Sequence, residues 1–585
     1  MYMVSIKFAL IISFVIISQA YAYTVHISAP AVLNGTDTGT LTGVSLNVTP
    51  GNGIIEINAG NMSVGNDTVN SAKQAVYYAA TYLNKSQASY NFIFTIDTLG
   101  SVSGPSAGAL FTVMAIAALE HKQLIGNFTE TGTINPNGTI GQIGGIFDKV
   151  GAAQKYHKKF IIVPYVYNKS TEYMLYYLSQ QAYSIPLVEA RNISEALQYA
   201  FGTTPPTYLN YNITADYNTS SLENASAFCT YCNESSFAEL TNFTFNYVGE
   251  EINSINSSKF GALKSQMNAL LLQYKNISMK GYMYTGADYA FIEYPTAFLF
   301  ANYNASNETK AMAIINNIYN YCSSLNYTGQ MTQNNYEYVI GGNLRKDWAL
   351  VTLSQSIELL NSSQTSDGVL FALDSAAPAY GWCAAASEMY NMSYSIGGNE
   401  YISLQPKVAS LASYELSEAV KKYGSQQLYV KAANYSFNNG DYATTLYSLT
   451  YANVFYNLST SINHNQTETE NAVKYALESA NGIWSTQFAL QSEFYLEEAS
   501  FNGNSIGYMQ DAYSTSLLSE RLGNLNTYLN HSFSYSNNTS IQYLQPKISQ
   551  ELGLIFGVLV IILMALIAIL IMLIVHILDH KRTKR

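Results

Sequence analysis

A serine and a lysine in two short glycine-containing segments are the residues of this chain best suited to chemistry. Ser106 lies in the segment Gly104–Gly108, directly after a Gly-Pro pair, and Lys149 ends the segment Gly144–Lys149. A serine hydroxyl is a weak nucleophile until a neighbouring group removes its proton. A lysine amine can accept that proton if burial lowers its pKa, because a site of low dielectric constant disfavours the charged ammonium. The two side chains could therefore form a nucleophile and base pair without a histidine.

The sequence also indicates which elements position this pair. An uninterrupted apolar run, Ala107–Leu119, follows Ser106 and predicts a buried helix. Ser106 would lie at the N-terminus of that helix, where the unpaired backbone N–H groups of Ser106 and Ala107 could stabilise an oxyanion. Lys149 is expected near the start of a second helix, which continues through Val150–Ala153.

Five segments in chain order resemble the proteolytic domain of the Lon family of Ser-Lys proteases. Thr131 follows Ser106 by 25 residues and Lys149 follows it by 43, and both separations match the family spacing. The resemblance spans roughly residues 37–200 and implies an α+β Lon-type proteolytic domain. The five segments are Val48–Gly53, Gly104–Gly108, Thr131–Gly132, Ile143–Ala153 and Phe160–Pro164.

The resemblance implies a role for each of three residues. Ser106 would be the nucleophile, Lys149 the general base, and Thr131 would hydrogen-bond near the lysine amine and orient it. Taken singly, each has an ordinary structural interpretation: a helix cap for the serine, a solvated helix residue for the lysine and a strand residue for the threonine. Two departures from the family pattern bear on the pH optimum. Ser103 stands where many members have an acidic residue, and the strand Val44–Asn47 lacks the carboxylate that many members carry there.

A Ser-His-Asp triad is the alternative arrangement for a catalytic serine. His121 follows the apolar helix, and His157 lies in the surface stretch Lys155–Lys158. Neither histidine lies in a segment typical of a catalytic site, so the lysine is the better candidate for the base.

Lon proteins usually carry an ATPase motor, and this chain has no phosphate-binding G-x-x-x-x-G-K-[ST] segment. The resemblance therefore predicts an ATP-independent peptidase without cofactor or metal. Its polypeptide substrates would have to be already unfolded, flexible or short. Lon domains commonly assemble as hexameric rings, so a homo-oligomer is also expected.

The N-terminus has the pattern of a secretory signal peptide, residues 1–22. Lys7 is the only charge before the apolar run Phe8–Ile17, and Ala20–Ala22 provides an A-x-A cleavage site. An uncleaved signal anchor is the alternative.

The C-terminus predicts a single transmembrane helix over residues 552–575. This stretch of 24 residues contains no charge and is long enough to cross a bilayer. The basic tail 576–585 follows it, and basic residues stay on the cytoplasmic side. Most of the chain would then lie outside the cell, anchored by one helix. A buried core helix is the alternative.

The composition agrees with an exported surface. Roughly two dozen Asn-x-Ser/Thr sequons mark potential glycosylation sites. Charged residues make up 11% of the chain, while tyrosine supplies 50 positions. Such a surface changes little with external pH and suggests an archaeal, potentially acidic, cell exterior. The net charge of −11 argues against nucleic acid as a partner, because that partner requires a basic patch.

Four cysteines lie in the predicted extracellular part, and they allow three disulfide pairings. Cys229 and Cys232 form a C-x-x-C pair, whereas Cys322 and Cys383 lie far apart in the sequence. Disulfides fit an oxidising compartment. A zinc site made of all four is a weaker alternative, because the second pair lacks metal-like spacing.

The chain divides into two large parts. Residues 23–205 alternate predicted strands and helices, beginning with a hairpin of strands 44–48 and 54–57, and end at a Pro-Pro break. Residues 206–545 are predicted to be mostly α-helical, with a tetratricopeptide-like helical hairpin at 428–458. A generic helical bundle is the alternative there. Residues 530–540, rich in Asn and Ser, suggest a stalk before the membrane.

These observations favour a membrane-anchored, extracytoplasmic, ATP-independent serine endopeptidase. The alternatives are a cell-surface glycoprotein or binding protein with a residual peptidase domain, and a domain that only cleaves its own chain. The intact set of Ser106, Thr131 and Lys149 favours the peptidase, since a scaffold would not need it.

Overall fold

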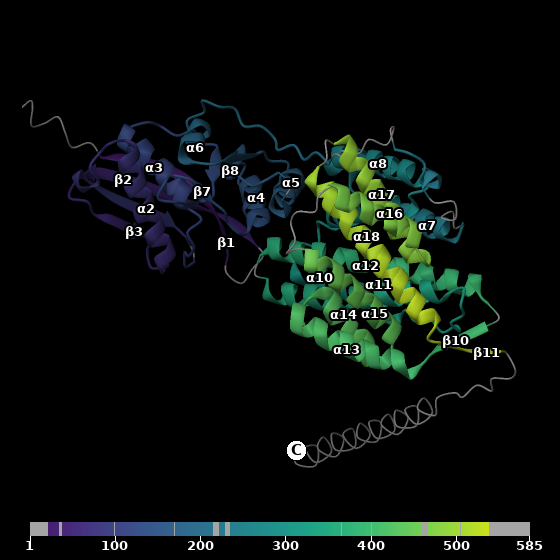
Figure 1. Ribbon diagram of the computed structural model, residues 1–585. Helices are drawn as coiled ribbons and strands as arrows, with labels where there is room; N and C mark the ends of the chain where they lie inside the picture. Colours follow the sequence, from purple (N-terminus) through teal and green to yellow (C-terminus); the bar gives the residue numbers. More distant parts are fainter. Residues whose placement is uncertain are drawn as a thin grey trace, which may run out of the picture.

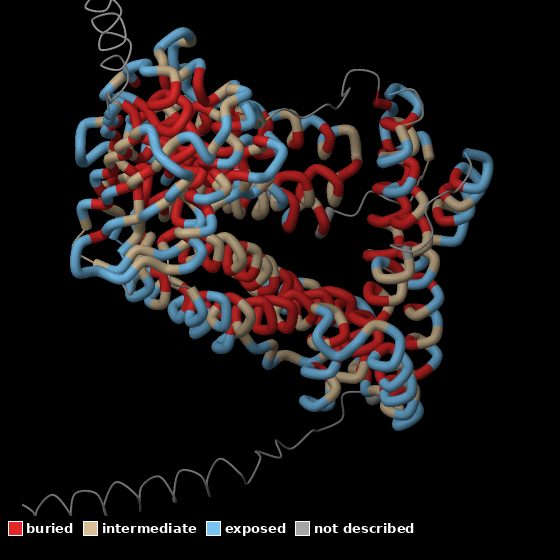
Figure 2. Tube along the Cα trace, turned by 90° about the vertical axis from the view of Figure 1, so that its left-hand side faces the viewer, coloured by how far each residue is buried: buried red, intermediate tan, exposed pale blue. Residues whose placement is uncertain are grey.

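The computed structural model describes the two predicted parts of the chain and the contact between them (Figure 1). The described residues are 22–33, 38–98, 100–168, 170–213, 222–228, 235–363, 365–398, 400–458, 466–502 and 505–537. The N-terminal part mixes strands and helices, whereas the C-terminal part is built almost entirely of helices. Buried residues gather in the interior of both parts (Figure 2).

A four-stranded sheet forms one layer of the N-terminal part, in the order β1-β2-β4-β3. Its strands are β1 (Tyr23–Val32), β2 (Gly39–Pro50), β3 (Ile55–Asn58) and β4 (Tyr90–Asp97). The predicted hairpin of 44–48 with 54–57 is wrong, because β4 lies between them. The side chain of Asn91 on β4 accepts hydrogen bonds from the backbone of Asn52 and Ile54, which holds the Pro50–Gly53 turn against β4 instead.

A second, parallel sheet combines β5 (Phe128–Glu130), β8 (Phe160–Pro164) and β9 (Leu187–Ala190). The strands β6 (Thr133–Ile134) and β7 (Ile140–Gly141) form a short antiparallel ribbon joined by a turn at Asn135–Gly138. Helix α3 (Gly108–Glu120) is buried along nearly its whole length, as its continuous apolar sequence predicts. The remaining helices are α2 (Asn66–Tyr82), α4 (Ile146–Lys155), α5 (Thr171–Tyr183), α6 (Ile193–Ala200) and the 3₁₀ turn η1 (Gln87–Ser89).

The C-terminal part is mostly helical, as predicted. The segment predicted as tetratricopeptide-like forms two helices joined by a short turn at Gly440, and its likeness to that repeat stays a prediction. The helices are α7 (Ser235–Ser254), α8 (Ser257–Met279), α9 (Met283–Ala301), α10 (Glu308–Ser324), α11 (Tyr336–Ser362), α12 (Ser366–Ile396), α13 (Pro406–Tyr423), α14 (Leu428–Asn438), α15 (Tyr442–Leu458), α16 (Gln466–Ser479), α17 (Ile483–Phe501) and α18 (Ile506–Asn530), with the 3₁₀ turn η2 (Ala225–Ala227).

A small antiparallel sheet corrects one detail of the helical prediction. Strand β10 (Glu400–Leu404) pairs with β11 (Phe533–Asn537). Phe533 is buried against Tyr336, so this end of the predicted stalk 530–540 belongs to the folded part. Alternation of Phe533 and Tyr535 with serines fits a strand better than a stalk.

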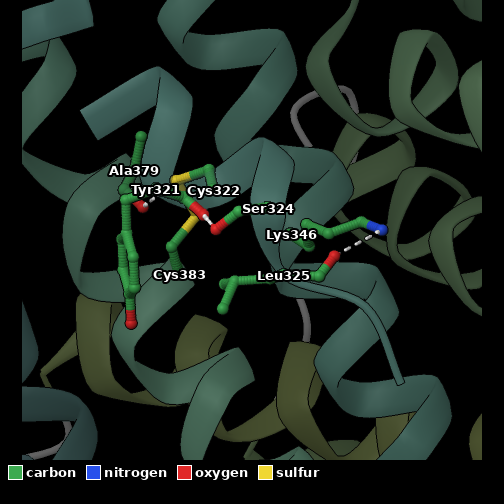
Figure 3. The surroundings of a disulfide bond; sticks show 7 residues. All are labelled: Tyr321, Cys322, Ser324, Leu325, Lys346, Ala379 and Cys383. Carbon is green, nitrogen blue, oxygen red and sulfur yellow. Dashed lines mark hydrogen bonds between the residues drawn. A yellow bond between two sulfur atoms is a disulfide. The ribbon is translucent and has the colours of Figure 1, made fainter. Parts of the chain in front are cut away.

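One disulfide joins the middle of α12 to α10. Cys322 and Cys383 are bonded, with Cα atoms 5.4 Å apart (Figure 3). Closing a loop of this length stabilises a fold by about 4 kcal/mol, mainly by restricting the unfolded chain. The pairing rules out the four-cysteine zinc site. Cys229 and Cys232 lie outside the described residues.

Two predicted segments lie outside the described residues: the signal peptide 1–22, apart from its last residue, and the membrane helix 552–575 with the tail 576–585. Among the residues that are described, no helix is both long enough and apolar enough to cross a bilayer.

The two parts share a hydrophobic core. One cluster of buried side chains contains residues of α4 and α5 together with residues of α8, α9 and α12, for example Phe147, Leu263 and Leu370. Figure 1 shows α4 and α5 on the side of the N-terminal part that faces the helices. The position of α4 therefore depends on packing from both parts.

Buried carboxyl groups predict that the protein is more stable in mild acid. Such a group binds a proton more tightly when folded than when unfolded, where carboxyls titrate near pH 4. The free energy of unfolding should therefore decrease as pH rises from about 4 to about 8, because the folded state holds more protons in that range. Burial raises the pKa of Glu130 to about 8, of Asp347 and Glu493 to about 7, and of Asp288, Asp367 and Asp374 to about 6.

Urea unfolding at pH 5 and at pH 8 measures this effect, and we expect the higher midpoint at pH 5. Glu130 provides a matched variant, because both its carboxylate oxygens are buried without a hydrogen-bond partner. Glu130→Gln should raise the midpoint at pH 8 and leave it nearly unchanged at pH 5. Equal midpoints at the two pH values for the parent chain would contradict the prediction.

Candidate active site

Two side chains of α2 form hydrogen bonds with the backbone of the loop that carries Ser106. Thr68 Oγ1 donates a hydrogen bond to the carbonyl of Gly104 at 3.0 Å, and Ser71 Oγ donates to that of Pro105 at 3.1 Å. Gly104 has a φ of 102°, which disfavours any other residue. Helix α3 begins at Gly108, so Ser106 lies just ahead of the helix rather than inside its first turn.

The segment after β5 holds the same loop from the other side. Gly132 N donates to the carbonyl of Ser106 at 2.8 Å, and Ala109 N donates to the carbonyl of Gly132 at 3.0 Å. A Cβ on Gly132 would lie 2.4 Å from Ile140 Cγ2, so this close approach requires glycine. The Thr131–Gly132 pair therefore holds the backbone of Ser106 next to the end of β5.

The structure brings Ser106, Lys149 and Thr131 together. Lys149 Nζ lies 3.2 Å from Ser106 Oγ and 3.2 Å from Thr131 Oγ1. Thr131 Oγ1 in turn donates to the carbonyl of Ser106 at 3.3 Å. Both Lys149 and Thr131 are buried. Gly145, the N-cap residue of α4, has a φ of 71°, and this left-handed conformation turns the chain into the helix that carries Lys149.

Burial changes the protonation of the lysine. Removal from water lowers the pKa of Lys149 to about 8, while the nearby carboxylates of Asp367 and Asp148 act in the opposite direction. A large fraction of the side chain is then the neutral amine near pH 8. The neutral amine has a lone pair and can accept a proton from Ser106.

Two helix N-termini meet beside this lysine and cap each other. Asp367, in the first turn of α12, accepts hydrogen bonds from the backbone N–H groups of Ile146 at 2.6 Å and Phe147 at 2.8 Å. Asp148, in the first turn of α4, accepts from Ser366 N at 3.0 Å and from Ser366 Oγ at 2.6 Å. Each carboxylate thus satisfies donors that the other helix leaves unpaired.

We call these four hydrogen bonds the reciprocal cap. It links the helix of the candidate base to the C-terminal part, across more than 200 residues of sequence. Sequence reasoning did not find it. The segment Thr365–Asp367 carries only the signal of an ordinary helix start, with the Thr365 side chain accepting from Gly368 N.

A cleft of about 330 Å³ opens beside Ser106. It lies between the ends of β1, β2 and β4 and the serine loop, and none of the described residues that form its wall is charged. The backbone N–H groups of Ser106 and Ala107 donate to no acceptor within the described residues, so they remain available to a bound group. Sequence reasoning did not locate this cleft, because its wall comes from five separate segments.

The histidines of the alternative triad lie elsewhere. His121 caps the C-terminal end of α3 and contacts Tyr23, at the opposite end of the helix from Ser106. A helix of 13 residues is about 20 Å long. His157 lies beyond the C-terminal end of α4, in the turn that leads to β8. Within the described residues no group of His, Cys, Asp and Glu side chains could hold a metal ion.

Comparison with known proteins agrees with the geometry of the N-terminal part. Residues 33–202 match the family described as Lon protease (S16) C-terminal proteolytic domain. No curated protein matches the chain. The matched range contains the serine loop, the Thr131–Gly132 pair and α4. Residues 33–202 therefore form a Lon-type serine protease domain, followed by a mostly helical region.

Proposed function

We propose that the protein is an ATP-independent serine endopeptidase in which Ser106 and Lys149 act as a Ser-Lys dyad on unfolded or flexible polypeptides. The observation that carries the proposal is a buried lysine, with its pKa lowered to about 8, whose amine lies 3.2 Å from the serine hydroxyl. These are the distance and the protonation state that a general base requires.

In the proposed reaction, the neutral amine of Lys149 accepts the proton of Ser106 while Oγ attacks the carbonyl carbon of the scissile bond. The N–H groups of Ser106 and Ala107 stabilise the oxyanion that forms. Lys149 then gives its proton to the leaving amine, and an acyl-enzyme remains. Water then attacks the ester while the same lysine accepts its proton, and the lysine returns this proton to Ser106 Oγ as the acid product leaves.

The proposed role of Thr131 is to orient the lysine. Its hydroxyl proton is directed at the carbonyl of Ser106, so its oxygen can only accept from the amine of Lys149. One N–H bond of the amine is thereby directed toward the threonine. This constraint favours the orientation in which the lone pair of the neutral amine points at Ser106 Oγ.

The cleft beside Ser106 suggests what the enzyme cleaves. Its wall consists of aliphatic, phenylalanine, serine and threonine side chains with exposed backbone. A charged substrate side chain would lose its hydration there without gaining a partner. We therefore propose a preference for uncharged, mainly apolar side chains next to the scissile bond.

The proposed location is the outside of the cell membrane, with the protein anchored by residues 552–575 after export through the signal peptide 1–22. The Cys322–Cys383 disulfide supports an oxidising compartment. The sequons and the low fraction of charged residues support an extracellular, glycosylated surface of archaeal type. A homo-oligomer, by analogy a hexameric ring, forms part of the proposal through the Lon-type domain.

The decisive experiment measures cleavage of a fluorescently labelled unfolded protein by the full chain in detergent, without ATP. Ser106→Ala and Lys149→Ala should each lower the rate at least about a hundredfold, because each removes one half of the dyad. Lys155→Ala is the matched control, since Lys155 is an exposed lysine in the last turn of the same helix.

Retained activity in Lys149→Ala would contradict the dyad. Cleavage of the parent chain only at one site of its own sequence, without hydrolysis of the labelled protein, would favour self-processing instead. Mass spectrometry of the products separates these outcomes.

The dependence of kcat/KM on pH should reflect the pKa of Lys149. Because the neutral amine is the active form, kcat/KM should rise with pH and level off above an apparent pKa of about 8. A rate that is already constant from pH 5 upward would indicate a different base. The profile must be recorded at temperatures where the chain stays folded over the whole range.

The reciprocal cap predicts a specific phenotype for Asp367→Asn. The negative charge at Asp367 favours the ammonium form of Lys149, so its removal should move the apparent pKa of kcat/KM to lower pH. An amide also offers one oxygen where two N–H groups were bound, and we expect kcat to fall about tenfold as α4 shifts. A change in kcat without a change in the pH profile would show a purely structural role.

Asp374→Asn is the matched control for this experiment. Asp374 lies on the same helix, and burial raises the pKa of its carboxyl as it does for Asp367. Among the described residues, the hydrogen bonds between α12 and α4 are made by Asp367 and Ser366 and not by Asp374, so both kcat and the pH profile should stay unchanged.

A further inference from the structure

A second cavity lies in the helical region, away from the protease domain. Its volume is about 380 Å³, which falls within the range of small-molecule sites. Its wall is formed by α7, α9, α11, α12, α15, α17 and α18, with contributions from α14. No residue of the protease domain contributes to the wall, so the cavity does not belong to the peptidase site.

All three tryptophans of the chain line this cavity, although they lie far apart in the sequence. Trp348 comes from α11, Trp382 from α12 and Trp484 from α17. Tyrosines and phenylalanines fill much of the remaining wall. Aromatic faces of this kind provide flat apolar platforms on which the C–H face of a ligand can lie.

Planar polar groups interrupt the aromatic wall. Arg345 is 7% exposed and its guanidinium lies 4.2 Å above the ring of Trp484. It donates to the carbonyl of Gly341 at 3.3 Å and forms no ion pair with a carboxylate of the described residues. The guanidinium also hydrogen-bonds to the phenol oxygen of Tyr451, another residue of the cavity wall, and it has further N–H donors that can bond to a ligand.

Negatively charged hydrogen-bond acceptors also line the cavity. Asp288 on α9 accepts a hydrogen bond from Gln491 Nε2 at 3.1 Å, and both residues line the cavity. Asp511 lies exposed at its edge. The cavity therefore offers fixed donors and fixed acceptors side by side, each on a planar side chain.

The charged side chains in the cavity wall exclude some classes of ligand. A cation would be repelled by Arg345, and an anion would be repelled by Asp288 and Asp511. A purely apolar ligand would displace water from these polar groups without using their remaining hydrogen-bonding capacity. A neutral molecule with several hydroxyl groups and an apolar face satisfies both the polar groups and the aromatic platforms.

We propose that this cavity is a binding site for a neutral saccharide of one or two rings. The hydroxyl groups would bond to Arg345, Asp288 and Gln491, while a ring face stacks on a tryptophan. This inference is independent of the peptidase proposal, because the two sites share no residue.

Tryptophan fluorescence tests the proposal directly, because every tryptophan of the chain lies in the cavity wall. The full chain in detergent is first dialysed to remove non-covalently bound sugars. It is then titrated with glucose, mannose, N-acetylglucosamine and cellobiose up to about 50 mM, a range that detects millimolar affinity. Excitation at the red edge of the absorption band avoids tyrosine. We expect a saturable change with at least one of these sugars.

Variants show whether the change arises in the cavity. Asp288→Asn keeps the shape of the side chain, and Gln491→Ala removes the partner of Asp288. Each should weaken the binding of that sugar at least tenfold while the urea midpoint shows that the chain is folded. Lys155→Ala, on α4 of the protease domain, should bind as the parent does.

Three probes of other classes complete the test: N-acetylphenylalanine amide, tetramethylammonium and benzoate. A saturable response to one of these with none to the sugars would overturn the saccharide proposal in favour of a peptide, cationic or anionic ligand. The absence of any response would overturn it as well and mark the cavity as a packing defect.

Discussion

The reciprocal cap between α4 and α12 is the interaction on which the candidate active site depends. A helix N-terminus buried against another would leave backbone N–H groups of both without partners, which is unfavourable. Here Asp367 and Asp148 satisfy those groups in exchange, and the apolar side chains around them join one core. The position of Lys149 thus follows from the helical region as much as from the protease domain. The disulfide at Cys383 anchors the middle of the same α12 helix.

Two electrostatic tendencies oppose each other in this protein. Burial raises the pKa values of many carboxyl groups, so the folded state gains protons, and stability, toward acid. Burial also lowers the pKa of Lys149, but only to about 8, so the neutral amine is scarce in acid. Stability and the proposed activity of the Ser-Lys dyad therefore favour opposite directions of pH. If Lys149 is the base, as proposed, the enzyme works near the upper pH limit of its range of high stability, because the neutral amine is scarce in mild acid.

Local sequence patterns predicted which candidate site residues lie together better than they predicted strand order and tertiary contacts. Ser106, Thr131 and Lys149 could be selected from short segments and their spacing, and the structure places their side chains within hydrogen-bond distance. The hairpin of β2 with β3 was wrong because the partner of both strands, β4, comes from a later segment that local sequence does not specify. Asp367 was missed for the same reason, since its carboxylate looks like any helix cap until the distant α4 is placed beside it. The cavity with Trp348, Trp382 and Trp484 also arises only from tertiary packing.

The reciprocal cap can form only late in the synthesis of the chain. Asp367 follows Ile146 by 221 residues, so a growing chain finishes the whole protease domain long before it contains the carboxylate that caps α4. During that interval the N-terminus of α4 lacks the Asp367 carboxylate, and Lys149 lacks half of the support around it. The peptidase proposed above would gain from such a delay. Its own unfinished, flexible polypeptide is then the nearest potential substrate, at a time when the cutting machinery is still incomplete.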